Sequence, residues 1–197
     1  GCYGMLGRDT GWPLRAGRGE EGAEGAGMNL ARLLKPELIL LELETRDLPE
    51  EEREEIPPEQ YLWDIKGRVL GELADLVDRS GRVSNRNKLL QDLIGRERKA
   101  TTGLSSGVAI PHVRTIYAKE LLIGFARSTP GVEFDCLDEG LAHLFFVMVA
   151  PPYDDTAYLK FYRQMAEAFS QRDYREDFME AQSEGEIMRL VKMMGQG

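Results

Sequence analysis

The sequence contains few of the residues that build disulfide frameworks or membrane spans. Only two of its 197 residues are cysteines, Cys2 and Cys136, which excludes a disulfide-stapled fold and indicates a reducing compartment. The longest apolar run is Leu144–Ala150, far short of the roughly 20 residues that cross a bilayer. No basic start followed by an apolar stretch and a small-residue cleavage site is visible. We therefore expect a cytoplasmic protein that is not embedded in a membrane.

Positive charge and histidine are also scarce. The chain has 25 basic against 34 acidic residues, a formal charge of −9, and this balance argues against nucleic acid, whose phosphates would be repelled. Its two histidines are His112 and His143. Because no cluster of His, Cys and acidic residues has the spacing of a metal site, we expect neither a metal nor another cofactor.

The acidity is concentrated in one segment. Residues 42–64 contain ten acids and two bases, a charge of −8, so the rest of the chain is nearly neutral. Pro49, Pro57 and Pro58 interrupt both helix and sheet there. We predict a solvated acidic insert at about residues 44–64 with one short helix around Glu50–Glu55. The insert is either a spacer or a docking element for a basic partner.

Residues 1–27 have a different composition from the rest of the chain. They include nine glycines, scattered charges and no periodic apolar residues, so they cannot bury enough surface to offset the entropy of ordering. We predict a disordered or loosely attached extension over residues 1–27 and a single domain over residues 28–197.

Beyond Met28, apolar segments that read as strands alternate with helical patterns. Helices are predicted over Gly67–Arg79, after a cap at Ser84, and in three stretches that follow Pro151-Pro152. The continuous apolar runs are typical of strands covered on both faces; the predicted strands are Leu38–Leu43, Val108–Ile110, Leu121–Ala126 and Leu144–Ala150. The pattern favours an α/β fold, a three-layer α/β/α sandwich with a mixed sheet of about five strands.

The segment Arg96–Arg114 contains the residues best suited to chemistry. Small, hydroxyl-rich stretches with glycines, Thr101–Gly103 and Ser105–Gly107, precede a short strand, and such loops suit an anion because their backbone N–H groups are accessible. Pro111 then fixes the chain before His112 at the strand end. An imidazole there can act as nucleophile, base or ligand, or be an ordinary polar residue.

These residues resemble a known family. The pattern R-E-x-x-x-x-T-G-x-x-x-G-x-A-I-P-H from Arg96 to His112 is similar to the type-2 IIA domain of the bacterial phosphoenolpyruvate-dependent phosphotransferase system, which includes the fructose/mannitol IIA and nitrogen-regulatory IIA proteins. The resemblance continues in Leu33–Glu37, Lys66–Val77 and Phe145–Pro151 and covers roughly residues 29–194.

The resemblance implies roles for individual residues. His112 matches the histidine that accepts a phosphoryl group from the carrier protein HPr or its nitrogen-branch counterpart, and Arg96 matches the arginine that balances the phosphate charge. The residues that match the loop beside the histidine are Thr102, Gly103, Ser105, Ser106 and Gly107. No metal is needed for this transfer.

One position departs from the family pattern. Tyr158 stands where the family has a second histidine that orients the first. Its hydroxyl can hydrogen-bond phosphate or imidazole but cannot share a proton near neutral pH, because the pKa of tyrosine is about 10; packing on the inner face of a helix is the alternative. We interpret His143 as a strand-end residue. The departure puts onward phosphotransfer in doubt more than phosphorylation of His112.

Two functions remain open at this point. The first is a phosphohistidine carrier or regulator, a phosphotransferase-system component rather than a stand-alone turnover enzyme, closer to the nitrogen-regulatory branch than to a sugar permease. Its partners are an HPr-like carrier and a regulatory target or transporter. The second is a non-phosphorylated interaction domain on the same fold. The first function requires that the His112 ring reach solvent and that Arg96 lie beside it.

Overall fold

The computed structural model describes residues 33–153, 155–171 and 174–194. The extension predicted over residues 1–27 lies outside the described residues, as does the boundary between it and the domain.

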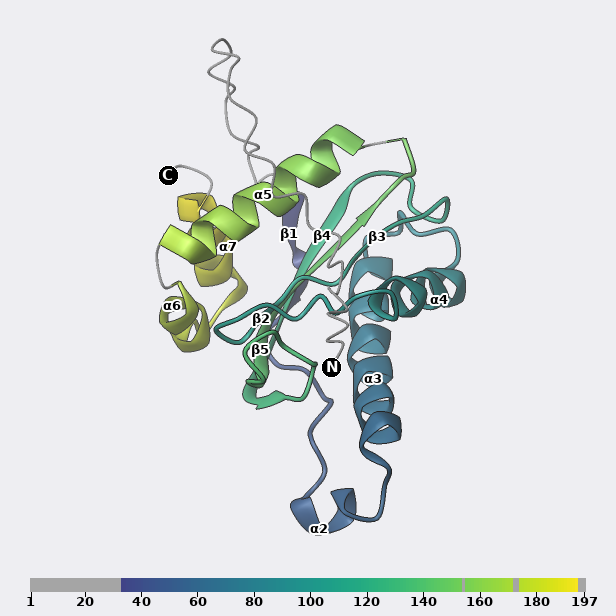
Figure 1. Cartoon of the computed structure of the whole chain (residues 1–197). Coiled ribbons are helices and arrows are strands. Elements are labelled where there is room, and N and C mark those ends of the chain that lie inside the picture. The colour runs from purple at the N-terminus through teal and green to yellow at the C-terminus, as the bar shows by residue number, and fades with distance from the viewer. Residues whose placement is uncertain (1–32, 154, 172–173, 195–197) are drawn as a thin grey trace, which may run out of the picture.

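Five strands form one mixed sheet (Figure 1). Their order is β1-β4-β5-β2, with β3 also paired to β5. β4 and β5 are antiparallel, whereas β1 runs parallel to β4 and both β2 and β3 run parallel to β5. The bounds of the strands are Leu34–Leu40 for β1, Val108–Ala109 for β2, His112–Arg114 for β3, Leu122–Val132 for β4 and Ala142–Ala150 for β5.

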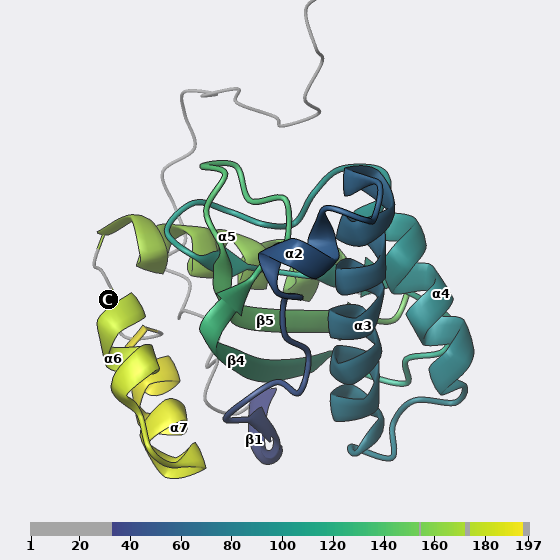
Figure 2. The same cartoon turned by 90° about the horizontal axis from the view of Figure 1, so that it is seen from below.

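Helices cover both faces of this sheet, as the two views in Figures 1 and 2 show. On one face lie α3 (Pro58–Asp78) and α4 (Arg86–Glu97); on the other lie α5 (Asp155–Gln171), α6 (Arg175–Glu180) and α7 (Glu184–Met194). Each face has its own apolar core, and β5, read as a strand covered on both sides, contributes Phe145 to one core and Phe146 to the other. The predicted three-layer α/β/α sandwich with a mixed sheet is confirmed.

The acidic segment is more ordered than the solvated loop expected from its composition. The short helix α2 (Glu50–Arg53) forms where one was predicted, but residues 58–64 belong to the first turns of α3, because Pro58 occupies the N-terminal position at which a missing N–H costs nothing. The Asp47 carboxylate accepts from the Tyr61 hydroxyl at 2.9 Å. Arg53 pairs with Glu133 and stacks over the Tyr61 ring. These contacts fix the segment against the domain.

The edge of the sheet beside β5 is divided between two short strands. β2 and β3 pair with the same side of β5, at Leu144 and at Met148 respectively, and Pro111, which has no N–H to donate, stands between them. His112 is therefore the first residue of a separate edge strand rather than a loop residue that follows a strand.

The start of α4 lies one residue later than predicted. Asn85, not Ser84, is the N-cap, and its side chain accepts from the backbone N–H of Lys88 at 3.0 Å. Ser84 instead donates from its backbone and hydroxyl to the carbonyl of Tyr117, a residue outside the helix. Gly81 follows the end of α3 with φ +66, a backbone conformation that favours glycine.

The cap yields a first prediction. We expect Asn85→Ala to lower the free energy of unfolding by about 1 kcal/mol, because it leaves an N–H of the first turn of α4 without a partner. The neighbouring change Ser84→Ala should cost less than about 0.5 kcal/mol, as is usual for exposed positions. Urea denaturation of both variants measures this, and an equal or larger loss in Ser84→Ala would contradict the assignment.

Candidate functional site

His112 lies under side chains from the two helical layers. Arg96, from the last turn of α4, places its Nη2 3.0 Å from Nε2 of the imidazole. From α5, Tyr158 and Tyr162 lie edge-on to the imidazole, with ring centroids 5.5 and 5.0 Å away. The two tyrosines are four residues apart and so share one face of α5. Three elements that are distant in sequence thus meet at this ring.

The hydrogen bonds of His112 fix its tautomer. Nδ1 lies 2.6 Å from the carbonyl oxygen of Ile110, and because a carbonyl only accepts, Nδ1 must hold the proton. A guanidinium only donates, so Nε2 must be the acceptor of the Arg96 hydrogen bond. The arrangement therefore selects a neutral imidazole with its lone pair on Nε2.

The charge state agrees with this tautomer. The pKa of His112 is lowered to about 4, mainly by burial and in part by the Arg96 cation, whereas the hydrogen bond to Ile110 and the Glu97 carboxylate act in the opposite direction. Burial also raises the pKa of Tyr158 and of Tyr162, with Arg96 opposing the rise. At neutral pH the site holds an uncharged imidazole and two phenols beside the Arg96 cation, and a second cation, Arg114, lies over the Tyr158 ring.

The expectation that the His112 ring reaches solvent is wrong for this conformation. His112 is only 5% exposed, because Arg96 and the two tyrosines cover its ring. These covering side chains are themselves half-buried, and an open cavity of about 820 Å³ is lined by Arg96, Tyr158 and Arg114 among others. Nε2 thus lies one layer of side chains beneath a surface hollow, while the predicted proximity of Arg96 holds.

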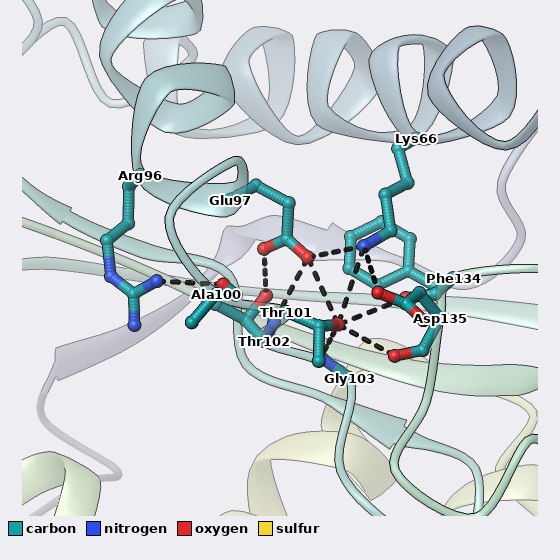
Figure 3. A network of polar contacts seen from close by, with 9 residues as sticks. All are labelled: Lys66, Arg96, Glu97, Ala100, Thr101, Thr102, Gly103, Phe134 and Asp135. Atoms are coloured by element: carbon teal, nitrogen blue, oxygen red, sulfur yellow. Dashed lines mark hydrogen bonds and ion pairs between the residues drawn. The ribbon is translucent and has the colours of Figure 1, made fainter. Parts of the chain in front are cut away.

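A buried ion pair lies behind the site and was not foreseen from the sequence (Figure 3). Lys66 Nζ lies 2.8 Å from Glu97 Oε1, and both side chains are 1% exposed. The Glu97 carboxylate also accepts from Thr102, at 3.0 Å from the backbone N–H and at 2.5 Å from the hydroxyl. Lys66 lies within 5.3 Å of the Trp63 and Phe134 ring centroids. Both residues stand in segments that match the family, but no pattern in the sequence predicts that Lys66 and Glu97 are buried and paired with each other.

The predicted phosphate loop is not assembled around His112. The backbone N–H of Thr102 donates to the Glu97 carboxylate, and that of Gly103 donates to the Thr101 hydroxyl. The backbone N–H of Ser106 donates to the Asp138 carboxylate. These three N–H groups are occupied by the protein, so they do not form the expected anion cradle.

The second half of that loop is also remote from the histidine. The Gly107 carbonyl accepts from the N–H groups of His143 and Leu144, whereas the carbonyl of Pro111 accepts from Met148. Because β2 and β3 both follow β5, this register separates Ser105, Ser106 and Gly107 from His112 by about 15 Å at roughly 3.3 Å per residue. The expectation that they lie beside His112 is wrong.

His143 lies at that opposite end, near the start of β5, as its interpretation as a strand-end residue requires. Its Nδ1 is 3.2 Å from the Ser128 carbonyl. A Cβ built on Gly131, which has φ +80, would come within 2.9 Å of the imidazole, so the ring occupies the space that this glycine leaves open.

The described residues contain neither a candidate metal site nor a candidate membrane span. Among them no three His, Cys, Asp or Glu side chains are grouped so as to hold a metal ion. None of the helices within residues 33–194 that the structure describes combines the length and the apolar character of a membrane-crossing segment.

Known proteins share both sequence and fold with this chain. The fructose-specific EIIA component of Haloferax volcanii is 35% identical over 119 residues, which cover 60% of this chain and 77% of that protein. The nitrogen regulatory protein of Pseudomonas aeruginosa is 29% identical over 126 residues, which cover 64% of this chain and 82% of that one.

Solved structures agree. The nitrogen regulatory protein IIA-Ntr from Neisseria meningitidis superimposes with a TM-score of 0.68 at 26% identity, covering 82% of this chain and 98% of its own. IIA mannitol from Escherichia coli, at 16% identity and a TM-score of 0.60 over 79% of this chain and 96% of its own, shares the fold.

The family model described as "Phosphoenolpyruvate-dependent sugar phosphotransferase system, EIIA 2" matches residues 62–194. This range is well over half of the chain and contains Arg96, His112 and Tyr158. The fold, the relatives and this match agree: the chain belongs to the EIIA type 2 family of the phosphoenolpyruvate-dependent sugar phosphotransferase system, as a phosphocarrier of the EIIA kind or a nitrogen-regulatory IIA protein.

Proposed function

We propose that His112 accepts a phosphoryl group on Nε2 from an HPr-type carrier. The observation that supports this best is the pairing of a neutral imidazole with a cation: the lone pair of Nε2 faces Arg96 at 3.0 Å. In the transfer, the lone pair attacks phosphorus and the bond between phosphorus and the donor atom of the carrier breaks. The electron pair of that bond returns to the carrier.

The surroundings of the ring suit the product as well as the nucleophile. Phosphorylated His112 holds a proton on Nδ1 and phosphorus on Nε2, so the ring gains positive character that the Ile110 carbonyl stabilises at Nδ1. Arg96 balances the new negative charge of the phosphoryl oxygens. Tyr158 and Tyr162 lie edge-on to the ring and keep their hydroxyl protons at neutral pH, because burial raises the pKa of both phenols.

Transfer requires a side-chain movement, because Nε2 is covered in the described conformation. Of the three side chains that cover the ring, Arg96 and Tyr158 line the open cavity. Rotation of the Arg96 side chain into that cavity frees the lone pair without moving the backbone, and leaves the guanidinium within reach of the incoming phosphate. The proposal therefore includes this rotation.

A labelling experiment tests the proposal. The full chain is incubated with labelled phosphoenolpyruvate, enzyme I, and either an HPr or a nitrogen-branch carrier. We expect label in the wild type and none in His112→Gln, while the matched variant His143→Gln is labelled like the wild type. The carrier that labels faster indicates the sugar or the nitrogen-regulatory branch. An unlabelled wild type beside an active control IIA protein would overturn the proposal.

The depressed pKa of His112 predicts the pH dependence. Because the ring is protonated only near pH 4, single-turnover uptake should stay flat from pH 8 to about 5.5 and fall only near pH 4, after correction for the donor's own titration. The folded ring binds its proton at lower pH than the unfolded chain, so stability should fall as the pH drops from about 6.5 towards 4. NMR titration of the imidazole measures the pKa, and a midpoint near 6.5 would contradict it.

The second candidate function, a non-phosphorylated interaction domain, is favoured by the 5% exposure of His112. It predicts that the chain binds the HPr-type carrier through the exposed carboxylates of α2 and its flank, without accepting phosphate. Calorimetry with that carrier should then give an unchanged affinity for His112→Ala and a weaker one when Glu50, Glu51 and Glu54 are changed to Gln together. The opposite pair of results rejects this function.

A further inference from the structure

We propose that Glu97, acting through Thr102, is a positioning residue for the acceptor histidine; this inference rests on the proposed function. Its basis is a series of hydrogen bonds that connects the buried Glu97 carboxylate to the imidazole through the backbone of Thr102 and of Ile110. Neither Glu97 nor Lys66 touches the reacting atoms.

The series runs through two backbone carbonyls. Thr102 donates its N–H and its hydroxyl to the two oxygens of Glu97. The Thr102 carbonyl accepts from the N–H of Ile110 at 3.0 Å, and the Ile110 carbonyl accepts from Nδ1 of His112 at 2.6 Å. The Thr102 and Ile110 peptide groups are therefore tied to each other, and Gly103 pairs with Ala109 in the same short ladder. A shift of Thr102 moves the carbonyl that selects the tautomer of His112.

The same carboxylate also holds the other side of the site. Arg96 precedes Glu97 in the chain and donates from Nη1 to the carbonyl of Ala100 at 3.0 Å (Figure 3). Residues 98–101 thus form a turn whose two ends, Glu97 and Thr102, are joined by the carboxylate. This turn fixes the Ala100 carbonyl that accepts from Nη1 of Arg96, while Nη2 of the same guanidinium reaches Nε2 of His112.

The charges explain why a carboxylate is used here. Its two oxygens accept from the Thr102 N–H, the Thr102 hydroxyl and the Lys66 ammonium, whereas the Thr101 hydroxyl, 3.3 Å away, makes its shortest contact, 2.8 Å, with the Asp135 carbonyl. A neutral amide would bring two donors of its own into this set. Lys66 compensates the buried charge, which without a partner is costly to desolvate, and Asp135 lies 3.6 Å from the same ammonium.

Thr102 allows a sharp test, because its hydroxyl can be removed with its shape retained. In Thr102→Val we expect phosphoryl uptake, as kcat/KM, to fall about tenfold through kcat, the size expected for loss of a hydrogen bond to a charged group. Thr102→Ser, which restores the hydroxyl, should recover it to within about twofold. The matched control is Thr45→Val: Thr45 also donates its backbone N–H and its hydroxyl to one carboxylate, that of Glu72, but has no part in the series to Ile110.

A second measurement is independent of phosphorylation. The ring ¹⁵N shifts of His112 should report the Nδ1–H tautomer in the wild type and in Thr102→Ser, and a mixture of tautomers in Thr102→Val. If Thr102→Val does not fold, Thr102→Ala is measured in its place. The inference would be overturned if the hydroxyl-free variant kept the wild-type ring shifts and the wild-type uptake, or if Thr45→Val lost as much uptake as Thr102→Val. If no form of the protein accepts phosphate, the proposed function fails, but the ring shifts still decide whether Thr102 positions the imidazole of His112.

Discussion

The hydrogen bond from Nδ1 of His112 to the Ile110 carbonyl, 2.6 Å long, determines which nitrogen of the ring is available. With Nδ1 held as the donor, the lone pair lies on Nε2 and meets the Arg96 guanidinium. Pro111 contributes by separating β2 from β3 along one side of β5, so that the carbonyl and the imidazole two residues later come together. The orientation of the imidazole is thus a property of the backbone at the sheet edge.

Burial has two opposite consequences at this site. It keeps the imidazole neutral, which nucleophilic attack needs, and it also covers the nitrogen that would attack. The cover includes the long side chains of Arg96 and Tyr158 beside an open cavity, and side chains change rotamer much faster than the backbone rearranges. A phosphoryl group on Nε2 would add about −1.5 to −2 charges there, by analogy with other phosphorylated side chains, and this would alter the surface that a partner meets.

The strong acidity of the chain is kept away from that surface. Arg53 of the acidic segment pairs with Glu133, the residue after β4. The end of β4 lies beside the start of β5, where Val132 pairs with Ala142. His112 pairs with Met148, further along β5. Six residues of extended strand between Ala142 and Met148 correspond to about 20 Å. This exceeds the Debye length of about 8 Å at physiological ionic strength, so the net charge of the chain says little about the electrostatics of the site.

Much of the fold was readable from the sequence because burial leaves a periodic trace. The run Leu144–Ala150 and the helical patterns around Leu70 and Ile187 gave the right elements, and only their ends were misplaced. At those ends, single contacts decide: Asn85 rather than Ser84 caps α4, and Pro58 begins a helix where prolines were expected to prevent one. Alternatives one residue apart differ little in local propensity, so tertiary contacts select between them.

By itself, the sequence determined the α/β layers, the family pattern from Arg96 to His112, and the closeness of these two residues that the pattern implies. The tertiary structure alone decided that Tyr162 joins Tyr158 over the ring, that Ser105–Gly107 lies at the far end of β2, and that Lys66 and Glu97 form a buried pair. The reason is that hydrophobic periodicity records which side of an element is buried. Which polar groups meet there depends on strand register and helix packing, and these are set by the whole chain.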